Sequence, residues 1–222
     1  MLIVGFPARE LATNCWVVAP DGGRHCVVID PGVGVADRVR TTLREHDLQL
    51  AAVLLTHGHL DHTFDAAEIC GAYGVAAYLH PADRYQLTDP ARGLGVPTGV
   101  PLFGRTNFAE PAEVSDLADG LRLELADLDI TVTGSPGHTP GSVLFGMRDG
   151  QSPVCFSGDT LFAGSIGRMD LPGGSEETMA RTLAEVVWPL PDDTVVHPGH
   201  GPSTTMATER ATNPYLLQRT SR

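Results

Sequence analysis

The stretch Thr56-His57-Gly58-His59-Leu60-Asp61-His62 carries four potential metal ligands within six residues. It directly follows residues 51–55, a continuous apolar run typical of a buried strand. A strand end can project a tight loop from a rigid scaffold, and Gly58 allows that loop to turn closely. Imidazole nitrogen and carboxylate oxygen together suit zinc, iron and related ions. The stretch therefore predicts a metal site at the end of a buried strand rather than a polar, solvated turn.

Three later segments place one histidine or aspartate beside glycine where an apolar run ends. They are residues 137–141 with His138, residues 157–160 with Asp159, and residues 198–201 with His200. Each is a weak signal alone, because an isolated loop histidine is usually just exposed and Gly-Asp is a common turn. Together with the first stretch they give seven potential ligands at four predicted strand exits. Seven ligands exceed the needs of one tetrahedral zinc and suit two metal ions with a bridging carboxylate.

Short β-rich runs alternate with helical patterns along the chain. The expected strands are residues 14–18, 26–29, 51–55, 75–79, 121–125, 130–133, 142–147, 154–157 and 194–197. The expected helices are one around Val39, one over residues 63–73, and one from an N-cap at Ser175 to Pro189. Residues 80–115 hold five prolines and are expected to be irregular, either over a binding site or as a plain surface connection. Two sheets face to face with helices outside would satisfy both halves.

Composition narrows the class of protein. The 222 residues suit one domain with a sizeable core, so we expect a single domain over residues 1–222. A net charge of -12 argues against nucleic acids and anionic membranes as partners. No apolar run reaches the roughly 18 residues of a membrane span, and no signal peptide is recognisable. The four cysteines form no C-x-x-C pair and are expected to be buried, reduced thiols. These features favour a cytoplasmic protein that acts on a small molecule.

The ligand pattern as a whole resembles that of the metallo-β-lactamase superfamily. His57-x-His59-x-Asp61-His62 is followed, in the family's order, by His138, Asp159 and His200. The resemblance covers essentially the whole chain. It implies an α/β fold, a four-layer αβ/βα sandwich with two metal ions at one edge. It also implies the ligands of each ion: His57, His59 and His138 at the first, Asp61, His62 and His200 at the second, and Asp159 bridging both.

Further segments resemble the glyoxalase II-like hydrolases of that superfamily. They are residues 167–174, residues 197–204, and Glu209-Arg210 followed by Asn213-Pro214. This likeness implies hydrolysis of a thioester, such as S-D-lactoylglutathione or an analogue on another thiol, by a metal-bound hydroxide. Asp61 would be catalytic by orienting that hydroxide as well as ligating. The chain ends 22 residues after His200, without the helical extension by which glyoxalase II helps to bind glutathione. Another thiol carrier or a broader thioester range is therefore an alternative.

Other assignments depend on single residues or on rival members of the superfamily. Zinc is the expected metal, and iron or manganese are alternatives because availability decides among them. Arg168 is a candidate contact for an anionic substrate, and an ion pair with Asp170 is the alternative. His80 and His197 could orient ligands or simply pack. Rival functions are a persulfide dioxygenase with one iron, a lactone hydrolase and, with least support, a non-catalytic binding module.

Overall fold

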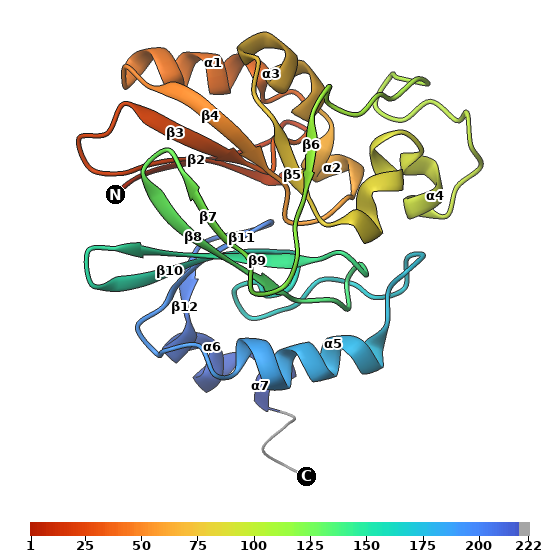
Figure 1. Ribbon diagram of the computed structural model, residues 1–222. Coiled ribbons are helices and arrows are strands. Elements are labelled where there is room, and N and C mark those ends of the chain that lie inside the picture. The colour runs from red at the N-terminus through yellow and green to blue at the C-terminus, as the bar shows by residue number, and fades with distance from the viewer. Residues whose placement is uncertain (218–222) are drawn as a thin grey trace.

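Two six-stranded sheets face each other in the computed structural model, which describes residues 1–217 (Figure 1). The first sheet has the strand order β1-β2-β3-β4-β5-β6, and the second has the order β12-β11-β10-β9-β8-β7. Helices α1 and α3 cover the outer face of the first sheet, and α5 and α6 cover that of the second. The predicted four-layer αβ/βα sandwich is confirmed.

The first sheet comes from the N-terminal half of the chain and is mixed. Strands β1 to β3 pair antiparallel, and β3 to β6 pair parallel. The strands are β1 (Leu2–Pro7), β2 (Asn14–Ala19), β3 (His25–Ile29), β4 (Gln49–Leu54), β5 (Ala77–Leu79) and β6 (Val114–Asp116). The helices of this half are α1 (Ala36–Glu45), α2 (Leu60–Thr63), α3 (Ala66–Tyr73), the 3-10 helix η1 (Pro81–Leu87) and α4 (Pro90–Leu94).

The second sheet is antiparallel except where β10 and β11 pair parallel. Its strands are β7 (Arg122–Leu125), β8 (Leu128–Gly134), β9 (Val143–Asp149), β10 (Ser152–Gly158), β11 (Val195–Pro198) and β12 (Thr204–Thr205). The helices are α5 (Glu176–Thr182), its π-helical continuation η2 (Leu183–Val187), α6 (Met206–Thr212) and α7 (Pro214–Leu217). Ser175 caps α5 as predicted, because its side chain accepts a hydrogen bond from Thr178 N.

The space between the sheets is filled by alternate side chains of facing strands. In β8, Leu128, Ile130 and Val132 are buried, whereas Asp129 is exposed and Thr131 is half-buried. The three buried side chains pack with Ile29 and Leu54 of the first sheet in one cluster. Successive side chains of a strand point to opposite faces, so this alternation directs one face of β8 into the core. Each such side chain contributes about 1.5–3 kcal/mol to stability, and the core gives the ligand loops a rigid base.

The prediction of one continuous helix over residues 63–73 is wrong, because this part of the chain forms two helices, α2 and α3. The N–H of Asp65 donates to Pro31 O at 3.0 Å, and the Asp65 carboxylate accepts from Ala36 N at 3.0 Å. These tertiary hydrogen bonds replace intrahelical ones at Asp65 and divide the two helices. The first helix begins at Leu60, earlier than predicted, and therefore carries Asp61 and His62 on a helical turn.

Residues 80–115 are less irregular than predicted, since they contain η1, α4 and the edge strand β6. Leu102 and Phe108, from the irregular part of this segment, pack against Leu60 and Phe64 beside α2. The segment thus lies over the helix that carries Asp61 and His62. Of the two alternatives for residues 80–115, this position favours a segment that covers the predicted metal site over a plain surface connection.

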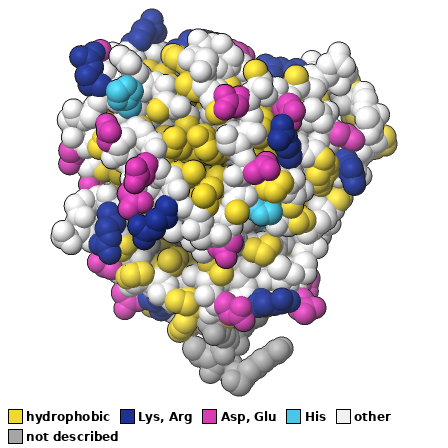
Figure 2. Space-filling view, viewed as in Figure 1, with side chains coloured by type: hydrophobic (Ala, Val, Ile, Leu, Met, Phe, Trp, Pro, Cys, Tyr) yellow, Lys and Arg dark blue, Asp and Glu magenta, His cyan; other side chains and the backbone are white. Residues whose placement is uncertain are grey.

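Three further sequence-based expectations bear on the class of protein. All four cysteines are buried and unpaired, as predicted. Within residues 1–217, no helix combines the length and apolar character needed to cross a bilayer. On the face shown in Figure 2, arginine side chains are interspersed with acidic ones and form no continuous basic surface. That the chain binds no nucleic acid stays a prediction.

Candidate metal centre

The seven predicted ligands meet at one edge of the sandwich, where strand ends of both sheets lie close together. Strand β4 leads into the loop that begins with His57. The parallel neighbours β10 and β11 end just before Asp159 and His200, and His138 lies in the loop between β8 and β9. In α/β sheets, ligands bind outside the carboxyl ends of the strands. The fold therefore collects residues that are up to 143 positions apart, from His57 to His200.

The seven side chains form three overlapping groups, in each of which the candidate ligand atoms all lie within 4.8 Å of one another. The groups are His57, His59 and His138; His57, His62 and Asp159; and Asp61, His62 and His200. Asp159 Oδ2 also lies 3.6 Å from His138 Nε2 and 3.5 Å from His200 Nε2. Asp159 is thus close to ligands of all three groups, which is the position that a bridging carboxylate requires.

Several buried polar atoms of this cluster have no hydrogen-bond partner within the described part of the chain. They are His57 Nε2, His59 Nε2, His62 Nε2 and Asp159 Oδ1, of which the last two face each other at 3.3 Å without forming a hydrogen bond. Leaving one buried polar atom unsatisfied costs about 1–3 kcal/mol, so four at one place require an explanation. Imidazole nitrogens and carboxylate oxygens that converge on a divalent cation provide it. The donor set therefore fits divalent metal ions.

Burial keeps two of the histidines neutral. It lowers the pKa of His57 well below the ordinary value, and the charges of neighbouring histidines, His62 first, lower it further. Burial and the nearby His138 lower the pKa of His59 to about 3. Metal ions bind the neutral imidazole, so both rings keep a lone pair available at pH 7 without losing a proton first.

Neighbouring carboxylates have the opposite effect on the pKa of His62. Burial alone would lower its pKa, but Asp159, Asp61 and Asp30 outweigh burial and raise the pKa well above the ordinary value. Burial would likewise raise the pKa of Asp159, and the charge of His62 and its contact with Asp159 outweigh that effect and lower it. Ionised carboxylates are thus held in a buried place, where they favour a positive charge.

Asp30, which was not singled out from the sequence, orients two of the histidines. Its Oδ2 lies 2.9 Å from His62 Nδ1 and accepts a hydrogen bond of 2.7 Å from Thr56 Oγ1. Thr56 Oγ1 in turn lies 3.1 Å from His57 Nδ1. A carboxylate bound to one ring nitrogen fixes the tautomer and directs the other nitrogen at the metal. The available signal was its position, since Asp30 directly follows strand β3 as Asp159 directly follows β10.

Other polar contacts hold the remaining ligand loops, and these too were missed. Thr13 Oγ1 donates a hydrogen bond of 2.8 Å to Asp61 Oδ2. Asn14 Nδ2 donates to Pro198 O and Gly201 O, at 3.0 and 2.8 Å, on either side of His200. Each supporting residue is far along the chain from the loop it holds. No local sequence pattern connects them, so only the folded chain reveals the contacts.

Two glycines are required by close approach to neighbouring atoms. A Cβ at Gly58 would lie 2.7 Å from Asp83 O and 2.8 Å from Asp83 Cβ. A Cβ at Gly199 would lie 2.2 Å from Asp159 Oδ1 and 2.7 Å from His62 Cε1. Real Cβ atoms essentially never approach below 3.0 Å. Gly58 thus matters for contact with another segment, and not only for the tight turn that the sequence suggested.

The less specific candidates lie outside the cluster. The exposed Arg168 side chain pairs with both carboxylate oxygens of Asp170 at 2.6 Å, which is the alternative weighed from the sequence. Only its backbone carbonyl reaches the cluster, 2.7 Å from His138 Nδ1, so a substrate contact by the guanidinium stays a prediction. His80 accepts a hydrogen bond from Ala82 N and caps η1. His197 packs its ring on that of Phe156.

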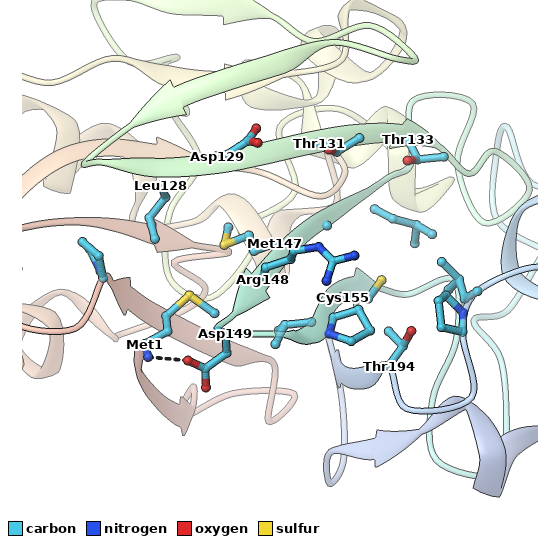
Figure 3. Close-up of a pocket in the computed structure, with 18 of the residues that line it drawn as sticks. Met1, Leu128, Asp129, Thr131, Thr133, Met147, Arg148, Asp149, Cys155 and Thr194 are labelled. Carbon is cyan, nitrogen blue, oxygen red and sulfur yellow. Dashed lines mark hydrogen bonds and ion pairs between the residues drawn. The ribbon is translucent and has the colours of Figure 1, made fainter.

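A cavity of about 560 Å³ lies away from these ligands, on the outer face of the second sheet (Figure 3). Thr131, Arg148 and Cys155, from β8, β9 and β10, are among the residues that line it. None of the seven predicted ligands does so. We place the chemistry at the histidine and aspartate cluster, because converging reactive groups mark an active site better than cavity size alone.

Comparison with known proteins identifies the family. The model of the metallo-beta-lactamase superfamily matches residues 8–200 of the chain. The chain belongs to this superfamily. The matched range begins before Thr13 and ends at His200, so it includes all seven residues of the cluster.

Individual members of the superfamily resemble this metallo-β-lactamase-fold protein over nearly its whole length. An uncharacterized protein of Mycobacterium tuberculosis is 44% identical, covering 97% of this chain and 98% of that protein. Hydroxyacylglutathione hydrolase GloC of Haemophilus influenzae is 35% identical, covering 95% of both chains. These matches make the chain a metallo-hydrolase of the superfamily.

Solved structures agree with the fold. The B3 metallo-beta-lactamase BLEG-1 has a TM-score of 0.85 and 35% identity, covering 97% of this chain and 99% of that one. TTHA1623, solved in a di-iron-bound form, has a TM-score of 0.79 and 34% identity, covering 97% and 100%. ETHE1 from Myxococcus xanthus, at 0.78 and 22% identity over 100% and 91%, shares the fold.

Proposed function

We propose that the chain is a dinuclear metal-dependent hydrolase that cleaves thioesters such as S-D-lactoylglutathione. The observation that carries this proposal is the set of three overlapping ligand groups built from seven side chains at one sheet edge. One tetrahedral ion would use four ligands at most, so a set of seven supports two ions. Zinc is the metal we propose, with iron or manganese as alternatives.

Each side chain has a role in this proposal. His57, His59 and His138 would hold the first ion, and Asp61, His62 and His200 would hold the second. Asp159 would contribute a carboxylate to both groups, since it lies close to His62, His138 and His200. Bound divalent ions would make water nucleophilic near neutral pH and polarise the substrate carbonyl.

Asp61 is the catalytic residue in this account. Burial would raise the pKa of its carboxyl, but His62, His200 and Thr13 outweigh burial and hold the pKa below the ordinary value. A carboxylate with a low pKa is a poor base but a good hydrogen-bond acceptor. We therefore assign Asp61 to orienting the water that attacks the thioester carbonyl. The carbon–sulfur bond then breaks, and the thiolate leaves readily without strong help from a general acid.

The likeness to a thioester hydrolase supports a thioester as the substrate. Hydroxyacylglutathione hydrolase GloC is similar over 95% of its own length, so its named substrate class suits a chain of this size. A broader thioester range or another thiol carrier is the alternative to glutathione.

The test is hydrolysis of S-D-lactoylglutathione by the purified, zinc-loaded chain, followed by release of free thiol. We expect turnover that falls at least about 100-fold in His200→Ala, since several kcal/mol of stabilisation depend on the metal site. His25→Ala, an exposed histidine at the start of β3, is the matched control and should turn over normally. Sulfite formation from glutathione persulfide, with oxygen consumed, would instead indicate a dioxygenase. Lactone cleavage without thioester cleavage would indicate a lactonase.

A further inference from the structure

Asp83 is a fully buried carboxylate at the start of the segment that precedes β6, in helix η1. It belongs to none of the three ligand groups. Within the described residues, no arginine or histidine lies at ion-pair distance from it. A buried charge is costly unless hydrogen bonds compensate it. The hydrogen-bond partners of Asp83 therefore indicate its structural role.

Those partners come from both ligand loops of the first metal site. Asp83 Oδ2 accepts hydrogen bonds from Gly58 N, at 2.9 Å, and from Thr139 Oγ1, at 2.6 Å. Its Oδ1 accepts from Gly141 N at 2.9 Å. Gly58 separates His57 from His59, while Thr139 follows His138 directly. One carboxylate thus binds the loop of the first sheet to the loop of the second.

The loops approach Asp83 so closely that both use glycine at the contact. A Cβ at Gly141 would lie 2.6 Å from Asp83 Cγ, and one at Gly58 would lie 2.8 Å from Asp83 Cβ. Apart from Asp83, the backbone bond from Val143 N to Thr56 O also joins the two sheets here, at 2.9 Å. That bond joins the strand ends, whereas Asp83 joins the loops themselves, where His59 Nδ1 and His138 Nε2 lie 2.8 Å apart.

We propose that Asp83 is a positioning residue that sets the geometry of the first metal site by fixing the His57–His59 loop against the His138 loop. Without Asp83, part of the free energy of metal binding would be used to order the two loops, and the affinity for the metal would fall. A preorganised site loses less conformational freedom on binding. The inference rests on the proposed metal centre but not on the identity of the substrate.

The test compares Asp83→Asn with Glu209→Gln. Glu209 is also buried and also accepts three hydrogen bonds, from Gly164 N, Thr204 Oγ1 and Asn213 Nδ2, but it lies outside the three ligand groups. Zinc affinity is measured by competition with a chelator, the absorption spectrum is recorded with cobalt(II) in place of zinc, and folding stability is measured separately in urea. We expect Asp83→Asn to weaken zinc binding about 10-fold or more and to alter the cobalt spectrum. Glu209→Gln should lose stability yet keep the wild-type affinity and spectrum.

A second, milder variant keeps the test informative if Asp83→Asn fails to fold. Thr139→Val removes only the hydroxyl that donates to Asp83 and should give a smaller loss of affinity in the same direction. Wild-type zinc affinity and cobalt spectrum in both Asp83→Asn and Thr139→Val would overturn the proposal and leave Asp83 a structural residue. A wild-type chain that binds no metal would overturn the metal centre itself, and this inference with it.

Discussion

Asp30 Oδ2 lies 2.9 Å from His62 Nδ1, and both side chains are almost completely buried. The carboxylate comes from the end of β3 and the imidazole from α2, so the contact joins the strand to the ligand helix. It leaves His62 Nε2 directed at Asp61 and Asp159, at 3.5 and 3.3 Å. Asp30 therefore determines which nitrogen of His62 is offered to the metal site.

Replacing this carboxylate should weaken metal binding without removing a ligand. In Asp30→Asn, an amide of the same shape replaces an acceptor that serves both Thr56 and His62. Asparagine tolerates the positive φ of 50° found here, so the backbone is preserved. Partners of this kind typically contribute 10- to 100-fold to metal affinity. Chelator competition measures the loss, and an unchanged affinity would contradict the orienting role of Asp30.

Gly199→Ala should damage the site by steric overlap. The new Cβ would lie 2.2 Å from Asp159 Oδ1, so the bridging carboxylate or His62 must move. We expect loss of one metal ion per chain and at least about a 100-fold loss of activity. Gly71→Ala is the matched control. This glycine is exposed in α3 with no atom near its Cβ position, and the change should raise stability by about 0.5–1 kcal/mol with normal metal content.

Metal removal should lower thermal stability reversibly. The Nε2 atoms of His57 and His59 have no hydrogen-bond partner among the described residues, and a bound cation would provide one. A ligand at 100 times its dissociation constant stabilises the folded state by about 2.7 kcal/mol. For a chain of this length that corresponds to a rise in Tm of roughly 5–10 °C. Differential scanning calorimetry with chelator, and again after zinc is restored, measures it. Equal Tm values would argue against a metal at these atoms.

The pH dependence of stability should change in His197→Phe. Burial lowers the pKa of His197 to about 4, below its unfolded value near 6.5. The unfolded chain therefore binds more protons between these pH values, and this residue's contribution to stability is lost as pH falls from 6.5 towards 4. Phenylalanine keeps the packing on Phe156 but cannot titrate. Urea unfolding at pH 7 and pH 5 should show a stability loss smaller by roughly 1–2 kcal/mol in the variant, the lower figure applying because the partly exposed ring is screened by solvent. An equal loss in both proteins would contradict the lowered pKa.

The candidate ligands of this site were easier to recognise in the sequence than the residues that support them. His57, Asp159 and His200 were recognisable because each follows an apolar strand beside glycine, and strand ends of one sheet edge come together in the fold. Asp83 gave no such signal, because it lies in a proline-rich segment where a polar residue normally faces solvent. Its burial depends on two loops from different sheets closing over it, which no local pattern expresses.

The boundary between α2 and α3 was likewise not predictable from local sequence. The apolar pattern over residues 63–73 predicts one helix, and local propensity contains nothing to divide it. The division occurs at Asp65 because its N–H and carboxylate bond to Pro31 and Ala36, which belong to a distant part of the chain. Tertiary hydrogen bonds of this kind override local preference, and here they also help to place the helix that carries Asp61 and His62.

The most direct test of the account is the number of metal ions bound per chain, measured by elemental analysis of the purified protein together with its thioester hydrolysis. The account predicts two ions per chain, falling to about one in His200→Ala with loss of turnover. A single iron per chain in the fully active protein, with sulfite formed from a persulfide and no thioester cleavage, would contradict it.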